Sequence, residues 1–297
     1  MANVKRSGGN DIKKFRFTVK TGAGERLDTW LVKKIPQYSR NFLASQIKSG
    51  RVWIGGRTAQ PKSVVHTGQN IIAELWIPRA EIAPEKIDID IIYQDKDLAV
   101  INKPAGMVVH PAGSHQTATL ANALKHIFPT SYLVHRLDKD TSGVLVVALN
   151  QTTKNWLSKL FEERKVKKTY LALLTGKIIP PEAYLDLPIK RGRSGKFEAL
   201  AGGRTAKSFY RVKEYLPGFS LVEVHPETGR THQIRVHFKA LKHPVVGDTM
   251  YGRGEKGLAR QFLHAHKIEF KDRQGKLRSF TAPLPKDLTD FLKYAKK

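Results

Sequence analysis

The most hydrophobic segment of the chain is residues 144–149, where six apolar side chains follow one another. An unbroken run of this kind is typical of a strand that is buried on both faces. The nine residues before it, HRLDKDTSG at 135–143, are instead dense in charged and polar groups. The pattern therefore predicts a charged loop that enters a core strand. Taken alone, such a loop is explained by solvation, because loops are ordinarily polar.

Two segments near the N-terminus carry apolar residues at helical spacing. Residues 24–35 form the first and residues 39–50 the second, with Ser39 placed as the N-cap of the latter. The inward-facing stripes of the two helices consist of Leu27, Trp30, Leu31, Ile35, Phe42, Leu43 and Ile47. Short strands are expected over 51–54 and 70–75. These elements predict a small α/β domain.

Extended segments dominate from residue 87 onward. Strands are expected over 87–93, 98–103, 143–149, 168–176, 206–212 and 219–226, and helices over 117–127, 152–163 and 231–241. This mixture favours an α+β fold with a mixed, largely antiparallel sheet and a central active-site cleft.

A polar stretch flanked by prolines suggests how the chain is divided. Residues 78–86 contain Pro78 and Pro84 and show no periodicity, so they are interpreted as a linker. We therefore expect a disordered basic tail over 1–15, a small domain over 16–77 and a large domain over 87–297.

The composition is strongly basic. The chain has 52 Lys and Arg against 26 Asp and Glu, a formal charge of +26, and such a field indicates a polyanionic partner. Nucleic acid is favoured over an anionic membrane surface. The absence of cysteine excludes disulfides, thiolate nucleophiles and cysteine zinc sites. No apolar run approaches the ~18 residues that span a bilayer, so we expect a cytoplasmic protein without membrane association.

Two further stretches gather polar groups. KKTY at 167–170 opens a predicted strand, and TGRTHQIRVH at 228–237 enters a predicted helix. In that helix His232, Arg235 and Lys239 share one stripe, because they are three and four residues apart. Taken singly, each basic residue is explained as a solvated surface group, and Tyr170 as a packing aromatic.

Other sites of known chemistry lack support in the sequence. No glycine-rich loop ends in Gly-Lys-Ser/Thr, and the GRGEKG spacing at 252–257 follows no strand. The histidines lack the spacing of a metal site, and no nucleophile elbow is present. Nucleotide hydrolysis, dinucleotide binding, metal catalysis and Ser-His-Asp chemistry are therefore disfavoured.

The polar stretches together resemble a known family. HRLDKDTSGVLVVA, KKTYLALLTG and TGRTHQIRVHFKALKHPVVGDTMYG occur in the order found in the RluA-type family of RNA pseudouridine synthases, and NKPAGMVVHP at 102–111 is similar to an earlier motif of that family. The resemblance covers roughly residues 87–288. The N-terminal elements resemble the RNA-binding module first recognised in ribosomal protein S-four, which they match at Arg26, Leu27, Asp28, Leu31, Ser39, Arg40, Ile47, Gly50, Val52 and Gly56. The chain departs from that module at Gly55, where Asn is usual.

The resemblance implies an isomerase that breaks the N-glycosidic bond of a uridine, turns the base and rejoins it through C5, without cofactor or metal. It implies that Asp138 is the catalytic aspartate, acting either as nucleophile or as base. Tyr170 would be the active-site tyrosine, and Arg235 the arginine that pairs with the aspartate. A partly buried carboxylate needs such a guanidinium to stay ionised, and arginine can bind it in a bidentate way. Arg136 would take the place of the flipped base.

The remaining implied roles concern RNA binding. Arg230, His232 and Gln233 are expected to line the RNA side of the pocket. Arg40, Lys48, Arg51 and Arg57 are expected to bind RNA from the N-terminal module. The implied partner is structured RNA, and the domain combination favours large-subunit ribosomal RNA. A transfer RNA synthase, or a catalytically silent RNA-binding or ribosome assembly protein, is the alternative. We expect a monomer.

Overall fold

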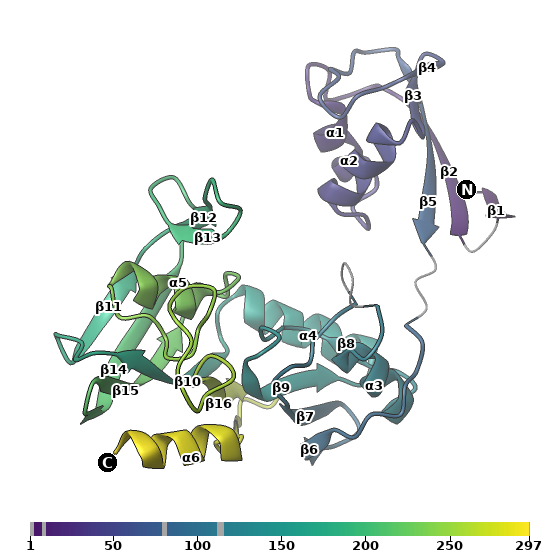
Figure 1. The fold of residues 1–297 in the computed structure, drawn as a ribbon. Coiled ribbons are helices and arrows are strands. Elements are labelled where there is room, and N and C mark those ends of the chain that lie inside the picture. Colours follow the sequence, from purple (N-terminus) through teal and green to yellow (C-terminus); the bar gives the residue numbers. More distant parts are fainter. Residues whose placement is uncertain (1–2, 8–9, 79–81, 112–115, 297) are drawn as a thin grey trace. The chain divides into compact units, whose positions relative to one another are not determined.

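The computed structural model describes residues 3–7, 10–78, 82–111 and 116–296. The chain divides into two compact units, Met1–Glu81 and Ile82–Lys297 (Figure 1). Each unit has its own hydrophobic cluster. The division falls inside the segment 78–86, where the sequence suggested a linker. No helix within the described ranges is long and apolar enough to cross a membrane.

The N-terminal unit packs two helices against a five-stranded sheet of order β1-β2-β5-β3-β4. Its elements are β1 (Asn3–Ser7), β2 (Asn10–Thr18), α1 (Leu27–Lys34), α2 (Arg40–Lys48), β3 (Val52–Ile54), β4 (Arg57–Thr58) and β5 (Asn70–Pro78). The Ser39 hydroxyl accepts a hydrogen bond from the Phe42 amide and caps α2, as predicted. Trp30 and Leu43 of the two helical stripes are buried.

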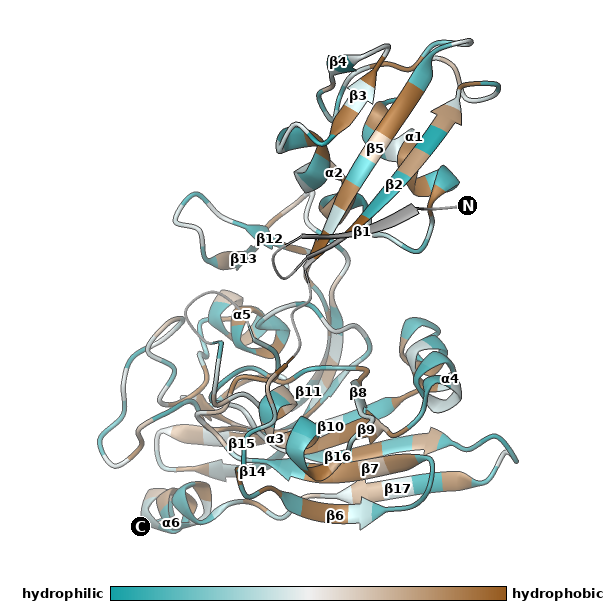
Figure 2. Ribbon diagram, turned by 90° about the vertical axis from the view of Figure 1, so that its right-hand side faces the viewer, coloured by the Kyte–Doolittle hydropathy of each residue, from teal (hydrophilic) through white to brown (hydrophobic). Residues whose placement is uncertain are grey.

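The disordered tail expected over 1–15 is contradicted at residues 10–15, which belong to a strand, while residues 1–2 and 8–9 lie outside the described residues. Strand β2 pairs with β5 along its whole length, from Asn10 to Thr18. Phe15 and Phe17 pack on the core of the unit and Val19 is buried within it. The segment before Phe15 has basic residues and no apolar run, so the composition suggested a solvated tail, but alternation in a strand places Phe15, Phe17 and Val19 on one face. In Figure 2, hydrophilic residues in teal alternate with hydrophobic residues in brown along β2.

The C-terminal unit is built on a ten-stranded sheet of order β11-β14-β15-β10-β16-β9-β7-β6, with β17 paired to β16 and β8 to β9. The strands are β6 (Asp90–Gln94), β7 (Leu98–Lys103), β8 (Tyr132–Leu133), β9 (Ser142–Ala148), β10 (Lys167–Thr175), β11 (Glu182–Asp186), β14 (Lys207–Leu216), β15 (Phe219–Pro226), β16 (Leu263–Lys271) and β17 (Leu277–Thr281). A separate ribbon is formed by β12 (Ile189–Arg191) and β13 (Phe197–Ala199), and the helices are α3 (Leu120–Ile127), α4 (Gln151–Glu162), α5 (Gln233–Ala240) and α6 (Lys286–Ala295). Every strand pair is antiparallel except β9 with β16, which confirms the predicted mixed, largely antiparallel α+β fold.

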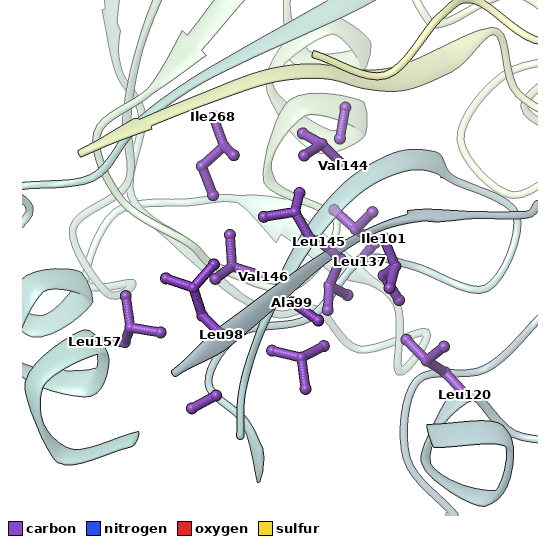
Figure 3. Packing of buried hydrophobic residues seen from close by; sticks show 14 of the residues in the cluster. Leu98, Ala99, Ile101, Leu120, Leu137, Val144, Leu145, Val146, Leu157 and Ile268 are labelled. Carbon is purple, nitrogen blue, oxygen red and sulfur yellow. The ribbon is translucent and has the colours of Figure 1, made fainter. Parts of the chain in front are cut away.

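Strand β9 lies in the middle of the main core and all seven of its residues are buried, as its unbroken hydrophobic run predicts. Figure 3 shows Val144, Leu145 and Val146 among side chains of β7, β16 and α4. Leu137, from the charged loop, lies in the same cluster and is only 4% exposed. The loop is therefore anchored to the core by its own leucine, directly before Asp138.

The parallel pair between β9 and β16 is short. Its register consists of Ser142 opposite His264 and Gly143 opposite Ala265. Gly143 has a φ of +119°, and a Cβ at this position would overlap the backbone of Ala265, so only glycine fits. The ring of His264 is fully buried and lies 2.9 Å from the Ser142 hydroxyl. This junction joins the strand that follows the charged loop to the remainder of the sheet.

Candidate active site

A pocket of about 520 Å³ lies where the charged loop, the start of β10 and the entry to α5 meet. All seven residues predicted for catalysis or substrate binding in this unit line it: Arg136, Asp138, Tyr170, Arg230, His232, Gln233 and Arg235. They come from three segments that are distant in sequence. The fold therefore brings together the side chains that the motifs suggested.

Asp138 lies one residue beyond the buried Leu137, and its carbonyl accepts the amide of Thr141 in a tight turn. Its carboxylate is 19% exposed. Arg235 Nη1 donates to Oδ2 at 3.3 Å, and His232 Nε2 lies 4.0 Å from Oδ1. The guanidinium therefore places a positive charge directly beside this carboxylate.

Arg235 is held mainly by a second carboxylate, that of Asp248. Nε and Nη2 of Arg235 donate to the two oxygens of Asp248 at 2.6 and 2.9 Å. Asp248 is fully buried, and its Oδ1 also accepts the amides of Met250 and Tyr251. The expectation of a bidentate pair between Arg235 and Asp138 is therefore wrong: the bidentate partner is Asp248, and Asp138 receives the remaining nitrogen.

Asp248 was missed by sequence reasoning. The only signal for it is a single carboxylate between the apolar pair Val245-Val246 and Tyr251, in VVGDTMY. Buried carboxylates are ordinarily paired, so this residue needed a cationic partner. Burial lowers the pKa of Arg235, but the hydrogen bonds and negative charges of Asp248 and Asp138 together outweigh this, and the pKa is raised. The guanidinium stays charged, and the Asp248 pair fixes the plane in which it faces Asp138.

Tyr170 lies on β10 and packs against the clusters on both sides of it. Burial raises the pKa of its hydroxyl, and the nearby charge of Asp138 raises it further. The phenol is therefore protonated at neutral pH and able to donate a hydrogen bond. Lys168, two residues earlier, also lines the pocket, and burial lowers the pKa of its ammonium to about 8.

His232 is the N-cap residue of α5, and its backbone is left-handed, with a φ of +56°. Its Nδ1 lies 2.9 Å from the Tyr251 hydroxyl. Burial lowers the pKa of the ring, and the Asp138 carboxylate opposes that shift without reversing it. A neutral imidazole thus faces the Asp138 carboxylate. A non-glycine residue in this conformation is uncommon, and such residues gather at functional sites.

Gln233 lines the pocket as predicted, but its amide is fully engaged by protein groups. Its amide oxygen accepts the Thr228 hydroxyl at 2.6 Å and the Arg230 amide at 3.0 Å. Its amide nitrogen donates to the Lys207 carbonyl and the Ser208 hydroxyl. These four bonds use the whole hydrogen-bonding capacity of a glutamine amide. Gln233 therefore holds the turn that carries Arg230 and has no group left to bind substrate.

The N-terminal unit contains four basic residues that were predicted to bind RNA. Their surroundings differ. Arg40 donates twice to the buried Asp28, at 3.1 and 2.8 Å. Arg51 stacks on Trp76 with its guanidinium 4.2 Å from the ring. Lys48 and Arg57 are exposed, and neither has an ion-pair partner within the described residues. Arg40 thus has a structural role in joining α1 to α2.

The comparisons with known proteins agree with this site. Residues 97–240 match the family model of RNA pseudouridylate synthases, and residues 25–71 match that of the S4 domain. The ribosomal large subunit pseudouridine synthase D of Neisseria meningitidis is 38% identical over 294 residues, which cover 91% of this chain and 78% of that protein. This chain belongs to the RNA pseudouridylate synthase family. It is an isomerase that converts uridine in RNA to pseudouridine, as the motifs predicted.

Further relatives cover the chain to different extents. The uncharacterised RNA pseudouridine synthase YlyB of Bacillus subtilis is 36% identical over 287 residues, 92% of this chain and 95% of that protein. The structure of human RNA pseudouridylate synthase domain containing 1 is 31% identical, with a TM-score of 0.58, and covers 68% of this chain and 85% of that one. The synthase fold and the S4 domain predicted from the motifs are thus confirmed.

Proposed function

We propose that this synthase isomerises uridine in large-subunit ribosomal RNA, with Asp138, Tyr170 and Arg235 as its catalytic residues. The observation that carries the assignment is the ion pair of Asp138 with Arg235 in the pocket that Tyr170 lines. The relative from Neisseria meningitidis is named for the large ribosomal subunit, which supports ribosomal over transfer RNA. The proposal extends to a cytoplasmic monomer without membrane association, which light scattering and cell fractionation would test.

The reaction begins when the target nucleotide leaves the RNA stack, because its glycosidic bond is inaccessible inside a helix. Arg136 is exposed and lies at the pocket two residues before Asp138. In this position its guanidinium takes the space that the base vacates. The opened helix is thereby stabilised without a contact to the reacting atoms.

The flipped uridine lies between Asp138 and Tyr170. The carboxylate acts on the ribose, as nucleophile at C1′ or as base, while the bond from C1′ to N1 breaks. The uracil turns and C5 forms the new bond to C1′ as the bond between C1′ and the carboxylate breaks or, where the carboxylate acted as a base, as the abstracted proton returns to the sugar. The proton on C5 then leaves and N1 takes up a proton. The Tyr170 phenol stacks on the uracil and offers its hydroxyl near C5. Since bonds are only exchanged within the nucleotide, no group has to be supplied from outside.

Tritium release tests this function. An unmodified large-subunit ribosomal RNA transcript and a transfer RNA transcript, each labelled with tritium at C5 of uridine, would be incubated separately with the wild type and with Asp138→Asn. We expect the wild type to release tritium from the ribosomal transcript and Asp138→Asn to release none. Asp140→Asn is the matched control, because it removes a carboxylate from the same loop, and it should retain release.

The outcomes separate the two parts of the proposal. Release by Asp138→Asn at the wild-type rate would refute the assignment of the catalytic aspartate. Release from the transfer RNA alone would leave the catalytic residues in place and move the substrate to the other class.

A further inference from the structure

One side of the pocket is lined by arginines that no carboxylate neutralises. Arg164 and Arg230 line the pocket, and Arg204 is near enough to act on Arg230. Burial lowers the pKa of Arg230, and the charges of Arg204 and Arg164 lower it further, since like charges repel. Among the described residues, no Asp or Glu forms an ion pair with any of the three. A group of this kind is unfavourable in the free protein.

Glutamates do occur beside this arginine cluster (Arg164, Arg204 and Arg230). Glu162 and Glu227 line the same pocket, yet neither pairs with a member of the cluster. The side-chain contact that the structure gives Arg230 is from Nε to the Thr205 carbonyl, at 2.9 Å. That bond orients the guanidinium but leaves its charge uncompensated.

The backbone at Arg164 is a second unfavourable feature. Arg164 follows α4 in the turn that leads to β10 (Figure 1), with a left-handed φ of +57°. Its amide donates to the Phe161 carbonyl, and the amide of Lys165 donates to that of Leu160. This is the position after a helix that glycine usually occupies, because a β-carbon is strained there. An arginine therefore gives this turn no advantage in stability over a glycine.

Lys242 provides a matched position in the same unit. It follows α5 with a left-handed φ of +64° and is exposed. Its amide donates to the Lys239 carbonyl, and the amide of His243 donates to that of Phe238. Its turn thus has the same pattern of backbone bonds as that of Arg164, and it also carries a cation. Unlike Arg164, it does not line the pocket.

We propose that Arg164, together with Arg204 and Arg230, binds the phosphodiester backbone of the RNA strand that continues from the flipped uridine. A phosphate group accepts the planar guanidinium in a bidentate way, and its charge removes the repulsion within the cluster. The uncompensated charges are then a feature of the free protein that RNA binding relieves, while the turn at Arg164 holds its side chain at the pocket. The inference rests on the proposed function, in which RNA enters this pocket.

Two glycine substitutions test the proposal. Arg164→Gly and Lys242→Gly each remove one positive charge and one left-handed β-carbon. Both are expected to raise the Tm of the full chain, by roughly 1–4 °C. Binding would be measured by filter retention of the unmodified large-subunit ribosomal RNA transcript at salt concentrations between 50 and 200 mM.

Only Arg164→Gly should change the salt dependence of binding. Each phosphate contact adds about 0.7 to the slope of log K against log salt for single-stranded RNA. The variant should therefore bind more weakly at 50 mM salt, and its further loss of affinity up to 200 mM should be about 2.5-fold smaller than that of the wild type. Lys242→Gly should keep the wild-type slope.

Several results would overturn the inference. If Arg164→Gly kept the wild-type slope and affinity, Arg164 would not contact phosphate. If both variants lost RNA affinity equally, the positive charge would contribute equally wherever it lies on the surface, and the pocket would have no special role. A lower Tm in Arg164→Gly would mean that the arginine stabilises the free protein. None of these measurements requires turnover, so they are independent of the tritium assay that tests the proposed function.

Discussion

The bidentate pair between Arg235 and Asp248 leads to a large predicted loss of stability in Asp248→Asn. Asp248 is 0% exposed and the side chain of Arg235 only 8%. Removing one member of a buried ion pair destabilises a protein by about 3–5 kcal/mol, because the other charge is left uncompensated. The asparagine amide also places an N–H group opposite a guanidinium N–H. For a unit of this size the loss corresponds to a fall in Tm of roughly 6–20 °C.

Glu182→Gln is the control for this prediction. Arg211 Nε donates to Glu182 at 2.6 Å, the same separation as between Arg235 Nε and Asp248, but these side chains are 62% and 52% exposed. An exposed pair of this kind contributes only ~0.2–1 kcal/mol. The two variants therefore compare ion pairs that have equal length and differ in burial.

Differential scanning calorimetry of the full chain provides the measurement. Amide hydrogen exchange in peptides from β9 identifies the transition that belongs to the C-terminal unit. If Asp248→Asn and Glu182→Gln lowered the Tm of this unit equally, burial would not govern the strength of the pair. The explanation of how Arg235 is held would then be wrong.

Two further predictions concern the junction of the sheet and the S4 domain. Gly143→Ala should separate β9 from β16, because its Cβ would overlap the Ala265 backbone; we expect tritium release to be lost and amide exchange in β16 to rise, and a variant with normal release would contradict this. In the S4 domain, the hydrogen bond from Arg26 and the neighbouring Arg40 lower the pKa of Asp28 to about 2. Since this value lies below the ordinary 3.8, the carboxylate contributes its full stabilisation above about pH 4 and loses it as the pH falls through 2. Unfolding of the domain followed between pH 5 and pH 2 should show this loss, and Asp28→Asn should be less stable at pH 5 and lack that part of the pH dependence.

The elements that the sequence predicted are those in which buried side chains recur at a regular spacing along the chain. The stripe of Trp30 and its neighbours identified α1, and the unbroken run in β9 identified a strand buried on both faces. Strands β11, β12 and β13 are short, and most of their residues are exposed or half-exposed, so they leave no comparable pattern. The N-terminal strand was missed for another reason: Phe15, Phe17 and Val19 alternate as in a strand, but the basic segment before them was interpreted as a solvated tail.

Of the site, the sequence predicted only those residues that lie within a recognisable motif. Asp138 and Arg235 each lie in a recognisable motif, although 97 positions separate them. Asp248 and the saturated amide of Gln233 were not predictable, because their roles depend on which groups the fold places around them. A glutamine beside an arginine looks the same in sequence whether it binds RNA or holds a turn.

The short parallel junction between β9 and β16 has a consequence for the synthesis of the protein. Ser142 and His264, which meet there, are 122 positions apart. During translation, β9, which follows the Asp138 loop, therefore cannot pair with β16 until most of the C-terminal unit has been made. A nascent chain that ends between residues 236 and 262 contains all of the predicted catalytic residues and lacks β16, to which both β9 and the Tyr170 strand are paired. Activity thus depends on a segment that contributes no catalytic group, and a prematurely terminated chain is expected to be inactive.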